Sequence, residues 1–185
     1  NVVVVRNWTH LPRWEPVERS KAKAALGWPP DVTLAVHTGN MGAKQGLDNI
    51  IEAARLADER GTAVHFVLLG DGSERRALED RAQGIARLSF IDPLSDTDYP
   101  LALSAADVLI VNEKLGVGAM AVPSKLTSYF AAGRPVVAAT DPNGITASEV
   151  LAANAGVVVP AGDPSALLAA VSALGMDAEA AEQYS

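Results

Sequence analysis

A serine and a lysine stand at the end of a loop that follows an apolar run, and at this position they can bind an anionic ligand. The run Val108–Val111 has the composition of a strand, and the loop after it reaches Pro123. Ser124 is a suitable N-cap for a helix expected at Lys125–Ala132, whose first amides would point outward. A helix N-terminus carries roughly half a positive charge, and Lys125 adds a full one. These features predict a diphosphate cradle; a plain capped helix with a solvated lysine is the alternative.

A second candidate loop, T-G-N-M-G-A-K-Q-G at Thr38–Gly46, stands between a predicted strand and a predicted helix. Its glycines permit a ligand to approach the backbone closely, and Lys44 is long enough to reach a phosphate. It is not a Walker loop, which requires G-K-[S/T], because Gln45 follows Lys44. The loop is therefore a candidate phosphate contact, with an ordinary glycine-rich turn as the alternative.

A third constellation partly imitates a dinucleotide-binding fingerprint. Gly70-Asp71-Gly72 follows a predicted strand, and Asp92 stands 20 residues beyond Gly72. Arg75 occupies the position of the third glycine, where a side chain is expected to prevent close packing of helix on strand. The pattern is weak support for a site that binds NAD.

Histidine and acidic residues supply little further chemistry. His10, His37 and His65 lack metal-ligand spacing, and the chain has no cysteine. Packing or surface roles are expected for them, although His37 ends a predicted strand near the candidate site. Asp96 and Asp98 imitate a D-x-D metal motif but stand among helix-capping residues. We expect no metal site.

Short β-branched runs alternate with helical patterns along the chain. Strands apolar on both faces and separated by amphipathic helices imply a parallel sheet covered on both sides, an α/β, Rossmann-like doubly wound fold. Ligands of such sheets bind beyond the carboxyl ends of the strands, where the three loops lie, whereas Asp107 opens a strand at the opposite edge. The expected strands are Val2–Val5, Leu34–Thr38, Val64–Leu69, Leu88–Ile91, Val108–Val111, Val136–Ala139 and Val157–Val159. The expected helices are Glu15–Leu26, Leu47–Arg60, Ser73–Gln83, Asp98–Ser104, Lys125–Ala132, Thr146–Ala153 and Ser165–Leu174.

Length and composition suit one globular domain over residues 1–185, with 49% hydrophobic and 20% charged residues. The net charge of −7 disfavours a general nucleic-acid binder. No apolar run reaches the roughly 18 residues that span a bilayer, and the absence of cysteine fits a reducing cytoplasm. Because the chain enters an apolar run directly after Asn1, we interpret it as a piece of a longer protein.

Taken in order, the segments resemble the C-terminal, nucleotide-sugar-binding domain of retaining glycosyltransferases with the GT-B fold, of the group 1 or family 4 type. The P-S-K-L version is similar to bacterial enzymes that build surface polysaccharide, of the colanic-acid and O-antigen type. The matching segments are V-V-R-N-W at Val4–Trp8, G-N-M-G-A-K-Q-G-L-D at Gly39–Asp48, L-L-G-D-G at Leu68–Gly72, S-F-I-D-P-L at Ser89–Leu94, A-A-D-V-L-I-V at Ala105–Val111, P-S-K to G-R-P-V-V-A at Pro123–Ala138, and A-G-V-V-V-P-A-G-D at Ala155–Asp163.

The resemblance implies a set of donor-binding residues. Two glutamates that many relatives carry eight residues apart would fall at Met120 and Ser128, and neither is glutamate. Glu113 is the candidate to compensate. The implied contacts are Asn40 and Lys44 at the diphosphate, Ile91, Asp92 and Pro93 at the nucleobase through backbone, Ser124, Lys125 and Leu126 at the phosphates, and Ser128 at the ribose, with Gly70, Asp71 and Gly72 in the same site.

The activity implied is transfer of a sugar from a UDP- or GDP-sugar to a lipid-linked acceptor, with retention and without a metal or other cofactor. Lys44, Lys125 and the helix N-terminus would offset the charge of the leaving group. Catalytic and acceptor-binding residues, and any peripheral membrane association, are expected on an N-terminal domain outside this chain. The alternatives are a UDP-sugar epimerase of the same fold, an NAD-binding oxidoreductase, and a non-catalytic nucleotide sensor.

Overall fold

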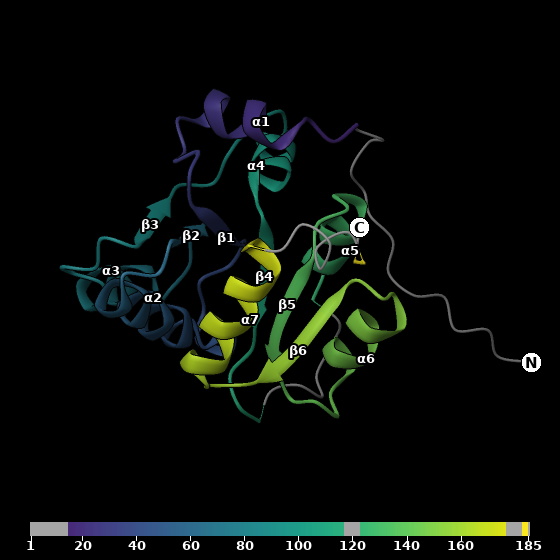
Figure 1. The fold of residues 1–185 in the computed structure, drawn as a ribbon. Helices are drawn as coiled ribbons and strands as arrows, with labels where there is room; N and C mark the ends of the chain where they lie inside the picture. Colours follow the sequence, from purple (N-terminus) through teal and green to yellow (C-terminus); the bar gives the residue numbers. More distant parts are fainter. Residues whose placement is uncertain (1–14, 117–122, 177–182, 185) are drawn as a thin grey trace, which may run out of the picture.

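A computed structural model describes residues 15–116, 123–176 and 183–184 (Figure 1). Six parallel strands form one sheet in the order β3-β2-β1-β4-β5-β6. The expected strand Val2–Val5 and position Met120 lie outside the described residues. The strands are β1 (Thr33–Thr38), β2 (Val64–Leu69), β3 (Leu88–Ile91), β4 (Val108–Asn112), β5 (Val136–Thr140) and β6 (Gly156–Pro160). The helices are α1 (Arg19–Leu26), α2 (Asp48–Arg60), α3 (Arg75–Arg81), α4 (Tyr99–Ala105), α5 (Lys125–Ala131), α6 (Ile145–Ala152) and α7 (Pro164–Met176), and a 3₁₀ turn, η1, covers Ala43–Gln45.

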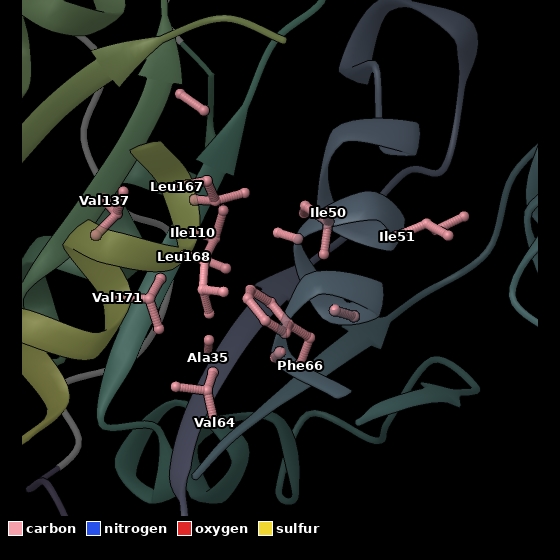
Figure 2. Packing of buried hydrophobic residues seen from close by; sticks show 14 of the residues in the cluster. Ala35, Ile50, Ile51, Val64, Phe66, Ile110, Val137, Leu167, Leu168 and Val171 are labelled. Carbon is pink, nitrogen blue, oxygen red and sulfur yellow. The ribbon is translucent and has the colours of Figure 1, made fainter. Parts of the chain in front are cut away.

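The central strands β1, β4 and β5 are buried along their whole length because helices cover both faces of the sheet. Side chains of α2, α3 and α7 pack on one face, and Figure 2 shows Ile50 of α2 and Leu167 of α7 converging on Phe66 and Ile110. Side chains of α4, α5 and α6 pack on the other face, together with residues around α1. The doubly wound arrangement is therefore confirmed.

The strand order reverses direction at the junction of β1 and β4. From β1 the chain adds β2 and β3 on one side, and β4, β5 and β6 then extend the sheet on the other. The register pairs only Ala35 with Val108 and Val36 with Leu109, so the two strands separate after two pairs. Such a switch point opens a crevice at the carboxyl ends of the strands, where α/β folds bind ligands.

Helix α1 begins later than expected, at Arg19 rather than Glu15. The Glu18 carboxylate accepts hydrogen bonds from the amides of Ser20 at 2.9 Å and Lys21 at 3.2 Å, which caps the helix there. All the other helices agree with their expected bounds to within two residues, and α3 is two residues shorter than expected at each end.

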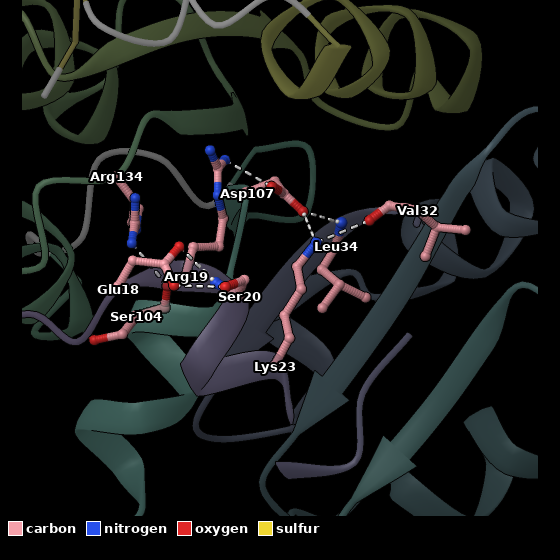
Figure 3. Close-up of polar contacts among 9 residues, drawn as sticks. All are labelled: Glu18, Arg19, Ser20, Lys23, Val32, Leu34, Ser104, Asp107 and Arg134. Carbon is pink, nitrogen blue, oxygen red and sulfur yellow. Dashed lines mark hydrogen bonds and ion pairs between the residues drawn. The ribbon is translucent and has the colours of Figure 1, made fainter. Parts of the chain in front are cut away.

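An ionic cluster occupies the amino ends of the strands (Figure 3). Asp107 accepts from Arg19 Nη1 at 2.7 Å, from Lys23 Nζ at 2.8 Å and from the amide of Leu34 at 2.7 Å. Helix α1 is thereby attached to the sheet beside α4. The position of Asp107 at the edge opposite the candidate site is confirmed.

Candidate functional site

Helix α5 is held at the switch point by a tyrosine whose hydroxyl contacts backbone groups at the separated ends of β1 and β4. Tyr129 is fully buried, and its hydroxyl accepts a hydrogen bond from the amide of Thr38 at 2.9 Å. The same hydroxyl lies 3.4 Å from the carbonyl of Ile110. Burial raises the pKa of Tyr129, so the phenol stays neutral. With Leu126 also buried, the start of α5 is fixed beside the carboxyl end of β1.

Ser124 precedes α5 at the N-cap position, as expected, but it does not cap the helix with its side chain. Its φ of −58° and ψ of −28° are already helical, and its side chain makes no capping hydrogen bond. Instead its carbonyl accepts from Thr127 Oγ1 at 2.8 Å, and the amide of Leu126 donates to the carbonyl of Pro123 at 3.0 Å. One of the amides expected to be free is therefore engaged. Since α5 has only 7 residues, the charge of Lys125 matters more here than the helix dipole.

Lys125 reaches from α5 across the switch point to β1. Its Nζ lies 3.0 Å from Nε2 of His37, and a side chain at Gly39 would come within 3.8 Å of the same amine. Burial lowers the pKa of Lys125 to about 7, opposed by the charge of Glu113. The Lys125 amine therefore lies beside the separated carboxyl ends of β1 and β4, and its contact with a diphosphate stays a prediction.

The loop after β1 is organised by Gln45, which the sequence analysis treated only as a departure from a motif. Gln45 Oε1 accepts from the amide of Gly42 at 3.1 Å and lies 3.4 Å from Asn40 Nδ2. Residues 43–45 form the turn η1, and Asn40 and Lys44 are both exposed on this loop. Exposure leaves both side chains accessible to a ligand.

Gly70 and Gly72 bring the loop after β2 into backbone contact with the loop after β1. A Cβ atom at Gly70 would lie 2.0 Å from the carbonyl oxygen of Gly39, and one at Gly72 would lie 2.6 Å from the backbone of Met41. The Met41 amide donates to the carbonyl of Asp71 at 2.8 Å. The two glycines thus serve the packing of one loop on another, and this explains the partial fingerprint.

Arg75 does not prevent helix packing, as the fingerprint comparison had suggested. Its guanidinium lies across the end of β2, where Nη1 donates to the carbonyl of Gly70 at 2.7 Å. The same nitrogen lies 2.7 Å from Asp92 Oδ1, and Nε lies 2.8 Å from Glu79 Oε1. Helix α3 therefore packs with an arginine where the fingerprint has glycine, and the arginine is paired with the acid that would bind a ribose.

A series of contacts links three of the predicted donor residues, Asp92, Gly70 and Lys125, along one edge. Asp92 meets Arg75, Arg75 meets Gly70, Gly70 touches Gly39, and Gly39 lies beside Lys125. The loops after β3, β2 and β1 thus meet the start of α5 in sequence.

Three other predicted residues, Ile91, Pro93 and Ser128, are placed only by their burial and backbone contacts. Ile91 is half-buried and its carbonyl accepts from the amide of Gly70 at 2.9 Å. Pro93 is exposed, and Ser128 is half-buried on α5. Their contacts to base and ribose stay predictions.

Glu113 is a second charged group at the crevice. Its carboxylate accepts from Thr146 Oγ1 at 2.9 Å and from Thr140 Oγ1, so hydroxyls from α6 and β5 hold both oxygens. Glu113 was predicted from the sequence as a compensating residue, whereas its two threonine partners were not predicted. The sequence indicated their role only by position, because Thr140 ends a strand next to β4.

Two asparagines, Asn112 and Asn49, support the η1 loop through hydrogen bonds, and neither was predicted from the sequence. Asn112 Nδ2 donates to the carbonyls of Gln45 at 2.8 Å and Gly46 at 2.9 Å. Its Oδ1 accepts from Asn49 Nδ2 at 2.8 Å. A polar residue at the end of the buried run of β4 was the available signal.

A cavity of about 450 Å³ lies on the α2 side of the η1 loop, and its lining includes Glu113 but none of the predicted donor residues. Its charged lining is mostly acidic, which opposes a diphosphate. The charged lining residues are Asp48, Glu52, Glu74, Glu113 and Lys114.

Within residues 15–116, 123–176 and 183–184, no group of three or more His, Asp or Glu residues is placed to hold a metal ion. In the same ranges no helix has the length and apolar character needed to cross a membrane.

Comparison with known proteins decides the family. The family model described as Glycosyl transferases group 1 matches residues 33–177. The chain belongs to the glycosyl transferase group 1 family. WcaI of Escherichia coli, named as a glycosyl transferase of colanic acid biosynthesis, is 34% identical over 139 residues. The match covers 72% of this chain and 33% of WcaI, so the chain spans about one third of that relative.

Solved structures of glycosyltransferases share the fold. HepE from Anabaena in complex with UDP and glucose superposes with a TM-score of 0.77 at 18% identity, covering 100% of this chain and 49% of HepE. The C-terminal domain of LpcC, a glycosyl transferase group 1 protein of Francisella tularensis, has a TM-score of 0.72 at 18% identity. That match covers 93% of this chain and 90% of the LpcC domain. The expected GT-B type of fold is therefore confirmed for this family member.

Proposed function

We propose that the chain is the donor-binding domain of a glycosyltransferase that transfers a sugar from a UDP- or GDP-sugar to a lipid-linked polysaccharide acceptor. The observation that carries the proposal is the Lys125 amine at the β1–β4 switch point, in a chain of the glycosyl transferase group 1 family. The similarity to WcaI supports a polysaccharide acceptor, and the UDP bound to the structurally similar HepE supports a nucleotide donor.

In the proposed complex the diphosphate lies at Lys125, with Lys44 and Asn40 reaching it from the loop after β1. The base extends toward Ile91, Asp92 and Pro93. Ser128 faces the ribose, and Ser124 and Leu126 border the phosphates, although the Leu126 amide already donates to the Pro123 carbonyl and supplies no hydrogen bond to them. The contact of Gly70 with Gly39 keeps the two loops together, so the ligand can span them.

The chemical step breaks the bond between the anomeric carbon and the diphosphate oxygen and forms a bond from that carbon to an acceptor hydroxyl oxygen. The hydroxyl proton leaves with the diphosphate or a base. Lys125 and Lys44 would offset the negative charge that grows on the leaving group, and this is our reason for proposing a reaction without a divalent metal. Retention at the anomeric carbon and a catalytic contribution from a separate N-terminal domain belong to the same proposal.

Of the alternatives, an NAD-binding oxidoreductase is not favoured, because Arg75 both replaces the third glycine and occupies Asp92. A UDP-sugar epimerase is not favoured either, since the family match is to glycosyl transferases. A nucleotide sensor would bind UDP but transfer no sugar once both domains are present.

Calorimetry of the chain with UDP, GDP and NAD tests the proposal. Binding of UDP or GDP, with a dissociation constant raised by Lys125→Met, is expected. NAD binding tighter than that of either nucleoside diphosphate would overturn it. A second assay adds a UDP-sugar and a lipid-linked acceptor: no transfer is expected from the chain alone, so turnover by these 185 residues would contradict the two-domain part of the proposal.

A further inference from the structure

His37, at the carboxyl end of β1, is not among the donor residues that the family resemblance implies, yet it contacts the central one. Its side chain is fully buried, and its Nε2 lies 3.0 Å from Nζ of Lys125. The two residues are 88 positions apart and meet because α5 starts beside the separated ends of β1 and β4.

The environment of the His37 ring defines its protonation. Nδ1 lies 3.2 Å from the carbonyl of Ile110, which can only accept, so Nδ1 carries the hydrogen. Burial, reinforced by the neighbouring Lys125, lowers the pKa of His37 well below its ordinary value. The ring is therefore neutral, and Nε2 presents a lone pair to the lysine amine.

No carboxylate is recorded in direct contact with the Lys125 amine among the described residues, and its recorded hydrogen-bond partner is this neutral ring. The titratable groups that bear on it are His37 from β1 and Glu113 from the end of β4. The Glu113 oxygens already accept from Thr140 and Thr146. An amine held this way has a fixed position, but neighbouring groups neutralise its positive charge only weakly. An anion that enters the crevice therefore strongly favours the protonated form of the amine.

We infer that His37 is a positioning residue for Lys125, and that the diphosphate binds together with a proton taken up by this amine. The inference rests on the proposed function, because it requires an anionic donor at Lys125. It goes further by assigning a role to His37 and a pH dependence to the site.

The sign of the pH dependence follows from linkage. The pKa of Lys125 is about 7 in the free chain, and a bound diphosphate raises it by favouring the charged form. Below pH 7 the amine is already charged and affinity is at its maximum. Above pH 7 binding requires proton uptake, so affinity falls by up to about tenfold per pH unit until the pKa of the complex is reached.

UDP-glucose is the suitable probe, because its diphosphate has no terminal monoester group to titrate near pH 6. Calorimetry with the full chain at pH 8, in Hepes and in Tris, measures the protons taken up, and titrations from pH 6 to 9 give the affinity profile. We expect uptake of part of a proton and a decline in affinity above pH 7.

Three variants distinguish the role of His37 in positioning Lys125 from a role in folding. His37→Gln keeps an acceptor for Lys125 and a donor for the Ile110 carbonyl, and it should retain proton uptake. His37→Leu should bind UDP-glucose several-fold more weakly at pH 7 and move the decline to lower pH. His65→Gln changes a histidine that contacts Ser89 on β3 and should behave as wild type. NMR of the Lys125 Cε signal follows the same ionisation without ligand, should the leucine variant not fold.

Binding of UDP-glucose without proton uptake would overturn this inference and leave the proposed function standing. The same holds if His37→Leu folds and keeps the wild-type affinity and pH profile, or if Lys125 titrates near pH 10. No binding of UDP-glucose, UDP or GDP would overturn the proposed function and this inference together.

Discussion

Lys23 Nζ lies 2.8 Å from Asp107 Oδ2, and the two side chains are only 6% and 8% exposed. The pair joins α1 to the amino end of β4, at the edge opposite the crevice (Figure 3). Lys23 also donates to the carbonyl of Val32 at 3.0 Å, so both partners are hydrogen-bonded beyond the ion pair. The attachment of α1 and the proposed donor site therefore occupy opposite edges of the sheet.

Asp107→Ala should destabilise the chain without changing its nucleotide affinity. Removing the carboxylate leaves the Lys23 ammonium buried and unpaired and the Leu34 amide without its acceptor, at a cost of about 3–5 kcal/mol. Urea denaturation measures this loss. Asp31→Ala, at an exposed turn residue, is the matched control and should change stability by less than about 0.5 kcal/mol. A similar small loss for Asp107→Ala would contradict the role of the buried pair.

Lys125→Met should weaken UDP binding and strengthen the fold. Loss of the charge-assisted contact is expected to cost about 1–2 kcal/mol of binding. The folded-state pKa near 7 lies below the unfolded value, so unfolding is favoured by protonation at neutral pH, and removing the amine should add about 1–2 kcal/mol of stability. Calorimetry and thermal unfolding check the two signs. Lys21→Met, at an exposed lysine of α1, should change neither, and a joint loss of binding and stability at Lys125 would argue for a structural role only.

Gly70→Ala should disrupt the contact between the loops after β1 and β2. The φ of Gly70 is +139°, and an added Cβ would collide with the carbonyl of Gly39. We expect a loss of at least about 2 kcal/mol of stability together with weaker UDP binding. Gly84→Ala separates strain from collision, because Gly84 has a φ of +82° but nothing within 4 Å, and about 1 kcal/mol is expected there. Equal losses at the two positions would show that the loop contact contributes little.

Acidification should destabilise the chain partly through His37. Its pKa is lowered in the fold, so below the ordinary value near 6.5 the unfolded chain binds a proton that the folded chain does not. The free energy of unfolding is therefore highest above pH 6.5 and falls as the pH falls through it. Denaturation at pH 5.5 and 7.5 should show a smaller difference for His37→Gln than for wild type. Identical differences would mean that His37 is protonated as readily in the fold as out of it.

The alternation of strands and helices was readable from the sequence because it depends on local composition and periodicity. Runs such as Val108–Val111 and Val136–Ala139 are apolar at every position, which is typical of a parallel sheet covered on both faces. The series of short motifs likewise identified the family. Lys125 at the start of a helix after β4 was placed correctly by spacing alone.

Helix ends and turns were less predictable, because they depend on a few competing hydrogen bonds. Ser124 has the composition of a cap but adopts helical angles, and its carbonyl is used by Thr127. Glu18 rather than an earlier residue caps α1. At these positions a side chain and the backbone offer alternatives of similar energy, so residue type does not decide between them.

The sequence by itself determined the order of elements, the family and the presence of a lysine at the crevice. Only the tertiary structure decided the partners: His37 for Lys125, Asp92 for Arg75, and Thr140 and Thr146 for Glu113. Each of these pairs joins separate elements of the chain. His37 and Lys125 meet because β1 lies beside β4 and then separates from it, which leaves the Ile110 carbonyl and the Thr38 amide to the side chains of His37 and Tyr129. Strand order and separation are global properties of the sheet, and no local pattern of residues encodes them.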